Sequence, residues 1–249
     1  MKFLLRICAA ALALWSTLVS ASEVQVAVAS NFAAAMQQLA TAFTQETGHK
    51  AVLSFASTGK FYAQIRNGAP FEILLSADQE TPLRLEQEGL ALRGSRWTYA
   101  TGRLVLWSAR SDLIDAKGEI LRQGRFEHLA IANPALAPYG RAAQEVLTQL
   151  GLWSSLQSRL VQGENIGQTY QFVASGNATL GLVALSQVMQ DGQLGAGSSW
   201  LVPAPLHTPL HQDAVLLKTG QSNPAAAALM DFLHSEKARA LMRAHGYTH

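Results

Sequence analysis

The sequence predicts an α/β protein of two lobes, in which each lobe carries a mostly parallel sheet flanked by helices and a two-crossing hinge joins them. Three observations predict this architecture. Short β-rich runs alternate with amphipathic stretches, this alternation occurs twice along the chain, and 249 residues that are 49% apolar can fill two modest cores. A single doubly wound domain is the alternative.

The first half of the chain reads as strand, helix, strand, helix, strand. Apolar side chains at helical spacing between Phe32 and Phe43 predict its first helix. The other two helices are expected over 60–67 and 82–88, and the second of these ends at Gly89. The strands are VQVAVA (24–29), AVLSF (51–55) and EILLSA (72–77). Strands separated by helices predict parallel pairing.

A similar unit recurs in the second half. Its predicted strands are HLAIANP (128–134) and LGLVAL (180–185), and its predicted helices are 142–150, ending at Gly151, and 166–175, ending at Gly176. Two further strands, RLVLWSA (103–109) and DAVLLK (213–218), lie between the halves and after the second. The last helices are expected over 225–233 and 236–245.

This order predicts a discontinuous first lobe, 22–103 with 206–249, and a continuous second lobe, 104–205. The chain would cross between the lobes twice, near residues 104 and 205. Two crossings form a hinge, and the cleft between the lobes would face the carboxyl ends of the strands in both sheets.

Residues 1–21 have the pattern of a secretory signal peptide. Lys2 and Arg6 precede an apolar run from Ile7 to Val19, and small residues follow, so cleavage after Ala21 is expected. A membrane anchor is the alternative, but the run is short for a span. Cleavage removes Cys8, the only cysteine, and leaves 17 Lys and Arg against 17 Asp and Glu. The absence of cysteine from the exported chain excludes disulfides and thiol chemistry. Its net charge of zero argues against a nucleic acid partner.

Four predicted turns lead into helices and carry the same chemistry. Each has a Ser, Thr, Asn or Pro start signal, and the turns are Ala29-Ser30-Asn31, Ser57-Thr58-Gly59, Ala137-Pro138-Tyr139-Gly140 and Glu164-Asn165-Ile166-Gly167. Simple capping explains any one of them. Helix starts that converge from two lobes would instead form an anion site made of N–H groups and hydroxyls, with no Lys or Arg required. Lys60 and Arg141 are left out of this site, and Glu164 is expected to point away from it.

Five stretches resemble the periplasmic molybdate-binding proteins of bacterial molybdate ABC importers, in the same order and over nearly the whole chain after residue 21. They are VAVASNFAAAMQQLA (26–40), FASTGKFYAQIRNGAPFEILLSADQ (55–79), AIANPALAPYGRAAQEVLTQLGLW (130–153), GENIGQTYQFVASGNATLGLVALS (163–186) and LMRAHGYT (241–248). The resemblance implies a type II periplasmic binding protein, a periplasmic location, no cofactor, and molybdate or tungstate as the ligand. It also implies delivery to a membrane permease, and the protein is expected to act as a monomer.

Carried over by position, the family's ligand contacts fall on Ser30, Asn31, Thr58, Tyr139 and Ile166. These residues would contact the oxyanion rather than bind the metal atom directly. Many members place a tyrosine hydroxyl at a position that is Ala184 here, so one ligand hydrogen bond is expected to be missing, with Tyr139 available to compensate. A pocket of donors suits a fully deprotonated dianion and disfavours hydrogen phosphate, whose proton needs an acceptor.

Other functions find less support in the sequence. No G-x-S-x-G, H-E-x-x-H, G-K-[ST] or GxGxxG motif is present, so an enzyme is not expected. His207 and His211 have metal-like spacing, but Pro209 between them argues against a shared helix face. A binding protein for sulfate, an organic anion or an amino acid, or a pure interaction module, remains open at this point.

Overall fold

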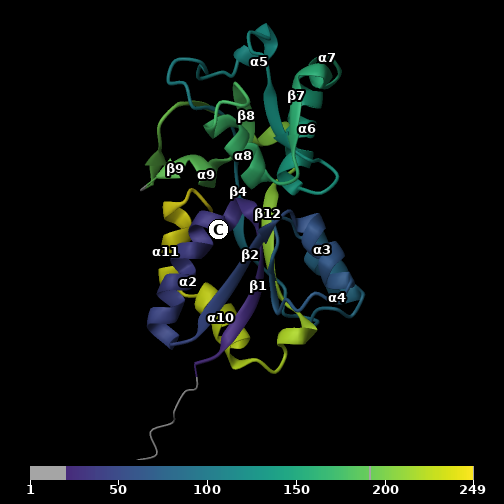
Figure 1. Cartoon of the computed structure of the whole chain (residues 1–249), viewed down its shortest axis with the longest axis vertical. Coiled ribbons are helices and arrows are strands. Elements are labelled where there is room, and N and C mark those ends of the chain that lie inside the picture. The colour runs from purple at the N-terminus through teal and green to yellow at the C-terminus, as the bar shows by residue number, and fades with distance from the viewer. Residues whose placement is uncertain (1–20, 191, 249) are drawn as a thin grey trace, which may run out of the picture.

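The computed structural model describes residues 21–190 and 192–248, which form two five-stranded sheets in two lobes (Figure 1). The first sheet has the order β2 (Lys50–Ala56), β1 (Glu23–Ala29), β3 (Ile73–Leu75), β12 (Leu210–Leu216), β4 (Trp97–Gly102). The second has the order β11 (Ser198–Leu201), β5 (Leu104–Ser108), β8 (Leu180–Ala184), β6 (Leu129–Ala132), β7 (Leu160–Gly163). The signal-peptide prediction falls on residues 1–20, outside the described residues, and on Ala21.

The strand pairing confirms the prediction of mostly parallel sheets. Strand β1 pairs in parallel with both β2 and β3, as the strand–helix–strand order predicts. In the second lobe β6 pairs in parallel with β7 and β8. Strand β12 is antiparallel to its neighbours β3 and β4, and β5 is antiparallel to β8 and β11. In each sheet, therefore, four strands run one way and the strand next to an edge runs the other way.

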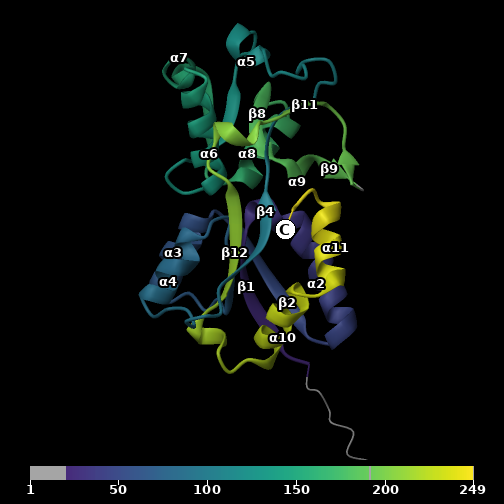
Figure 2. The same ribbon diagram turned by 180° about the vertical axis from the view of Figure 1, so that it is seen from behind.

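Helices cover both faces of the first sheet because successive side chains of its strands point to opposite faces (Figures 1 and 2). Val26 and Val28 of β1 pack under one layer of helices, whereas Ala27 packs under the other. The first layer contains α2 (Ala33–Thr47), α10 (Pro224–Leu233) and α11 (Glu236–Ala244), with the short η1 (Ser30–Phe32) leading into α2; the second contains α3 (Thr58–Arg66) and α4 (Glu80–Gln87).

The second sheet is covered in the same way. Ile131 and Leu182 face one apolar core, and Ala130 and Val183 face the other. The first core is closed by α5 (Ile120–Gln123), α6 (Pro138–Gln149) and α7 (Trp153–Leu156), and the second by α8 (Ile166–Ala174) and α9 (Leu185–Val188). A small hairpin of β9 (Met189–Gln190) and β10 (Gln193–Leu194) and the short helices η2 (Gln157–Arg159), η3 (Ala204–Leu206) and η4 (Lys218–Gly220) complete the described chain.

The chain passes from one sheet to the other twice. Strand β4 ends at Gly102 and β5 begins at Leu104, and β11 ends at Leu201 before β12 begins at Leu210. Strands β4 and β12 pair with each other in the first sheet, so the two crossings lie side by side (Figure 2).

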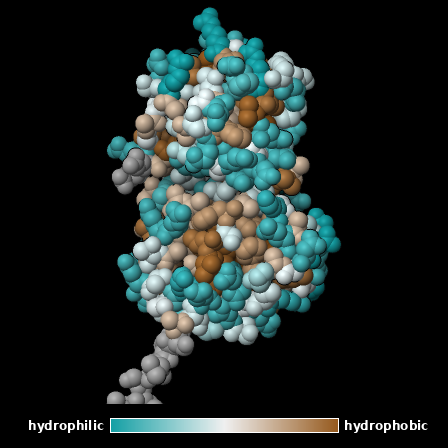
Figure 3. All heavy atoms as spheres, viewed as in Figure 1, coloured by the Kyte–Doolittle hydropathy of each residue, from teal (hydrophilic) through white to brown (hydrophobic). Residues whose placement is uncertain are grey.

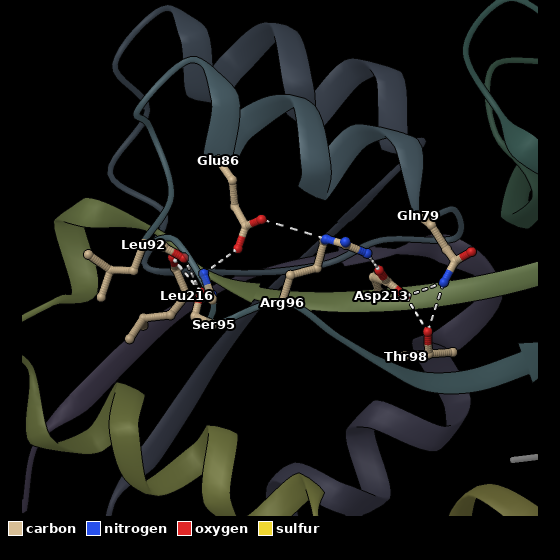
Figure 4. Close-up of polar contacts among 9 residues, drawn as sticks. Gln79, Glu86, Leu92, Ser95, Arg96, Thr98, Asp213 and Leu216 are labelled. Atoms are coloured by element: carbon tan, nitrogen blue, oxygen red, sulfur yellow. Dashed lines mark hydrogen bonds and ion pairs between the residues drawn. The ribbon is translucent and has the colours of Figure 1, made fainter.

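An ion pair between the partly exposed Arg96 and the buried Asp213 fixes β12 near these crossings (Figure 4). The Asp213 side chain is fully buried and accepts hydrogen bonds from Arg96, from Thr98 Oγ1 at 2.7 Å and from Gln79 Nε2 at 3.2 Å. The register of β12 against β4 shifts between Gln212 and Asp213. A buried carboxylate is tolerated only when it is paired and hydrogen-bonded, and this one is, so the bulged strand has a defined geometry.

The predicted elements all appear, with changed bounds for some. Helix α6 begins at Pro138 rather than residue 142, and α3 begins at Thr58 rather than residue 60, so the predicted turns are the first turns of these helices. Strands β4, β7 and β11 were not predicted. Within the described chain, no helix has the length and apolar character needed to cross a membrane. Figure 3 shows polar side chains around the junction of the lobes and an apolar area on the first lobe.

Candidate functional site

A small cavity lies where helix starts from both lobes meet. The volume open to the centre of a water molecule is about 10 Å³, which is room for about one water. All five residues carried over from the family resemblance line it. The lining residues are Ala29, Ser30, Asn31, Ala56, Ser57, Thr58, Ala77, Ala137, Pro138, Tyr139 and Ile166.

Ser30 reaches the second lobe at the start of α8. The N–H of Gly167 donates to Ser30 Oγ at 3.3 Å, and Asn165 caps the same helix by accepting from Gln168 N at 3.0 Å. The N–H of Ile166, at the first position of α8, has no acceptor inside its own helix. Because Ser30 Oγ already accepts a hydrogen bond, its own hydrogen is available to a group in the cavity.

Thr58 has a similar arrangement at the start of α3. Its Oγ1 accepts from Ala77 N at 3.1 Å, so its hydroxyl hydrogen can also be donated into the cavity. Ser57 caps the helix by accepting from Lys60 N at 3.4 Å, and Gly59 N donates across the lobes to Leu136 O at 2.9 Å. These bonds use the next two N–H groups of α3, while that of Thr58 has no acceptor in the helix.

Tyr139 lies in the first turn of α6, behind Pro138 at the first helical position. The N–H groups of Gly140 and Arg141 both donate to Ala137 O, which leaves that of Tyr139 without a helical acceptor. The Tyr139 side chain is buried, and this burial raises the pKa of its hydroxyl well above the ordinary value. The hydroxyl is therefore neutral and able to donate a hydrogen bond at any physiological pH.

Asn31 differs from the other four because its side-chain nitrogen is already bound. Its Nδ2 donates to Gln212 Oε1 at 2.9 Å and to Tyr247 OH at 3.0 Å, and its backbone oxygen accepts from Ser186 Oγ at 2.8 Å. What Asn31 can still offer an anion is therefore its backbone N–H. Its Oδ1 is buried without a hydrogen-bond partner among the described residues.

Sequence reasoning missed Gln212 and Tyr247, which support the cavity from behind. Both are buried, and both contact Asn31 from more than 180 positions away along the chain. One signal could have found Gln212. It is followed by Asp213 within the otherwise apolar end of a buried strand, and two adjacent polar residues there need specific partners.

No Lys or Arg lines the cavity among the residues that the structure describes. Lys60 instead pairs with Glu164 at 3.3 Å, so that Glu164 points away from the cavity, as expected. Arg141 pairs with Asp78 at 3.2 Å and with Glu80 at 3.1 Å. Both cations thus form ion pairs that bridge the two lobes. Burial raises the pKa of the Asp78 carboxyl, and hydrogen bonds from Thr81 and Ser76 and the charge of Arg141 oppose this rise.

Two further sequence expectations concern residues near the cavity or metal binding. Ala184 is buried at the end of β8 and carries no hydroxyl, so the family's tyrosine has no direct replacement at this position. In the described part of the chain no group of three or more His, Cys, Asp or Glu side chains is placed to hold a metal ion. His207 and His211 lie in an exposed segment, and His211 Nδ1 is 3.0 Å from Thr101 Oγ1.

Comparison with known proteins places this geometry in a family. The molybdate-binding protein ModA of Azotobacter vinelandii is 55% identical over 227 residues, covering 91% of this chain and 90% of the relative, and that of Rhodobacter capsulatus is 49% identical over 228 residues, covering 92% and 89%. The solved structure of a periplasmic molybdate-binding protein of A. vinelandii superposes with a TM-score of 0.89 at 43% identity, covering 91% of this chain and 99% of that one. The model of the family described as bacterial extracellular solute-binding protein matches residues 24–248. The chain is therefore a member of the bacterial extracellular solute-binding protein family.

Proposed function

We propose that this protein captures molybdate, and tungstate in the same way, between its two lobes and delivers it to the membrane permease of an ABC importer. The observation that carries the proposal is the meeting of three helix starts and two hydroxyls from opposite lobes around one cavity without a cationic side chain. Relatives at 55% and 49% identity are molybdate-binding proteins, which supports the same ligand here. We infer a binding protein rather than an enzyme, acting as a monomer and without a cofactor.

The donors available to the anion are of two kinds. The backbone N–H groups of Thr58, Tyr139 and Ile166 lack acceptors in their own helices. Each also lies at the positive end of its helix dipole. The hydroxyls of Ser30 and Thr58 already accept hydrogen bonds and so offer their hydrogens. Hydrogen bonds to an ionised acceptor are about twice as strong as neutral ones. Together these donors can hold a dianion without a formal counter-charge.

We further propose lobe boundaries at 22–103 with 206–249 and at 104–205, and a mature chain that begins at Ser22 in the periplasm. Each proposed lobe then contains one complete sheet, and the crossings between β4 and β5 and between β11 and β12 act as the hinge. The cavity has room for about one water, and a tetrahedral oxyanion is larger. We therefore expect the lobes to separate for entry and to close around the anion less tightly than they do here.

Isothermal titration calorimetry tests the ligand. We expect tight binding of molybdate and tungstate, with no heat from hydrogen phosphate, because the proton of that anion would face donors only. Sulfate is the closest competitor, since it is also a bare dianion. Stronger binding of sulfate than of molybdate, or binding of an organic acid alone, would replace molybdate with that ligand and leave the two-lobed capture mechanism intact.

A further inference from the structure

The Tyr139 side chain leaves the cavity and reaches the strands on which the chain crosses between the lobes. Its hydroxyl accepts a hydrogen bond from Gln212 Nε2 at 3.3 Å. This bond joins α6 of the second lobe to β12 of the first. The other end of the same amide, Gln212 Oε1, accepts from Asn31 Nδ2 at 2.9 Å and from Tyr99 OH at 3.0 Å. One fully buried side chain therefore links a cavity residue of each lobe.

Gly102, the last residue of β4, makes room for this contact. A Cβ atom at this position would lie 2.0 Å from Tyr139 OH and 2.4 Å from Gln212 Nε2. Both distances are far below van der Waals contact, so any larger residue would push the tyrosine hydroxyl away. The glycine is thus explained by the close approach of a side chain from the opposite lobe.

The first-lobe side of the contact is held rigidly. Gln212 is positioned by Asn31 and Tyr99, and the next residue, Asp213, is anchored by the ion pair with Arg96 (Figure 4). Tyr99 OH also lies 3.1 Å from Ser76 O, directly after β3, so its single hydrogen is shared between Ser76 O and Gln212 Oε1. Tyr139, by contrast, belongs to α6 of the second lobe.

We propose that Gln212, Tyr139 and Gly102 form a positioning device, the crossing contact, that stabilises the closed arrangement of the lobes. The Tyr139 hydroxyl can lie beside Gly102 and accept from Gln212 only when the start of α6 is brought against the first lobe. The inference rests on the proposed function, because the affinity for the anion includes the free energy of closure. The side chains of the crossing contact act on the anion through lobe closure and not by touching it.

The experiment compares Tyr139→Phe and Gln212→Met with the matched control Tyr99→Phe. Tyr99 and Tyr139 are both buried and both hydrogen-bond to Gln212, but the Tyr99 bond stays within the first lobe. The distance between lobes is measured by pulsed electron paramagnetic resonance with spin labels at Gln87→Cys and Gln149→Cys. These positions are exposed at the ends of α4 and α6, and the chain from Ser22 contains no other cysteine. The affinity for molybdate is measured by calorimetry.

Tyr139→Phe and Gln212→Met should weaken molybdate binding about tenfold and increase the fraction of molecules with a long interlobe distance. Tyr99→Phe leaves Gln212 held by Asn31, so it should lower thermal stability to a similar extent while changing the affinity and the interlobe distance less than Tyr139→Phe does. Equal affinity and equal distances in Tyr139→Phe, Gln212→Met and the wild type would overturn the crossing contact. If the wild type binds no molybdate, the proposed function fails, and the crossing contact is then tested by the ligand-free distance distributions alone. A shift to longer distances in Tyr139→Phe supports the crossing contact. Identical distributions overturn it.

Gly102→Ala tests the steric part of the same device. The added methyl group should displace the Tyr139 hydroxyl and weaken binding at least as much as Tyr139→Phe does. Since Tyr139→Phe removes the closest clashing atom and leaves Gln212 Nε2, the double variant should recover part of the binding that Gly102→Ala loses. A double variant whose loss equals the sum of the two single losses would show that Gly102 acts independently of Tyr139.

Discussion

At the scale of single residues, the cavity shows how a hydroxyl is made into a donor. Ser30 and Thr58 each accept a backbone N–H, from Gly167 and Ala77, and each keeps its hydroxyl hydrogen to donate. A free serine could rotate to accept a proton from a ligand such as hydrogen phosphate. In this cavity the backbone N–H occupies one of the two lone pairs of each oxygen, so fewer orientations let the hydroxyl accept from a ligand. Selectivity for a bare dianion can therefore be built from two neutral side chains.

We predict that Ser30→Ala and Thr58→Val each weaken molybdate binding by about 1 to 3 kcal/mol, because each removes one charge-assisted hydrogen bond. Thr58→Val keeps the shape of the side chain and so isolates the hydroxyl. Calorimetry measures the change, with Thr148→Val as the control, since Thr148 is exposed on α6 and bonds only to Gln144 O of its own helix. Unchanged affinity in both site variants would remove these hydroxyls from the ligand contacts.

At the scale of elements, the helix starts were predictable because their signals are local. Ser57 and Asn165 cap α3 and α8, and Pro138 occupies the first position of α6, as their residue types predict. Within the two five-stranded sheets, the strands that the sequence did not reveal, β4, β7 and β11, are all at edges, and of the edge strands only β2 was predicted. An edge strand pairs on one side only and is partly exposed, so it lacks the continuous apolar run that marks a buried strand.

The support behind the cavity could not be predicted in this way. Gln212 and Tyr247 reach Asn31 through contacts that span 181 and 216 positions of sequence. Such contacts depend on how the lobes and the C-terminal segment fold back on the first strand, and no local pattern encodes them. The residue types at the cavity were therefore predictable from the sequence, whereas their partners required the structure.

The capped helix starts lead to a prediction at this scale. Asn165→Ala removes the cap of α8 and should lower the free energy of unfolding by about 1 kcal/mol. It should also weaken molybdate binding, because the uncapped first turn no longer holds the Ile166 N–H in place. The matched control is Ser235→Ala, which removes the cap of α11 away from the cavity. Denaturant unfolding and calorimetry separate the two effects. The prediction is contradicted if both variants lose stability and neither loses affinity.

At the scale of the whole molecule, several polar contacts join the lobes near the cavity. Gly59 N to Leu136 O, Gly167 N to Ser30 Oγ and the ion pairs of Lys60 and Arg141 all join one lobe to the other. The apolar core centred on the second lobe also takes in Ala29 and Ala77 of the first, whereas surface ion pairs contribute little free energy each. A bound anion that gains donors from both lobes would add to the stability of the closed arrangement.

Three of the five tyrosines, Tyr99, Tyr139 and Tyr247, are buried. The first two hydrogen-bond to Gln212 and the third to Ser186. Burial raises the pKa of each of them above the value of about 10 that a tyrosine has in an unfolded chain. Above pH 10 the unfolded chain therefore loses protons that the folded protein keeps. The stability that is fully present below pH 10 then falls as the pH rises, by up to about 1.4 kcal/mol per pH unit for each tyrosine.

We predict from this a steep loss of stability in alkali, roughly 4 kcal/mol per pH unit for the three tyrosines together. Because the total stability of a globular protein is about 5 to 15 kcal/mol, unfolding should follow within a few pH units of 10. Denaturant titrations at increasing pH measure the slope, and Tyr139→Phe should reduce it by about a third. Tyrosinate absorbance should show these three hydroxyls ionising together with the loss of helical circular dichroism. Ionisation of the three hydroxyls near pH 10, in a protein that keeps its structure, would contradict the prediction. It would mean that water reaches these side chains and that the lobes are joined less tightly than the buried contacts of Gln212 require.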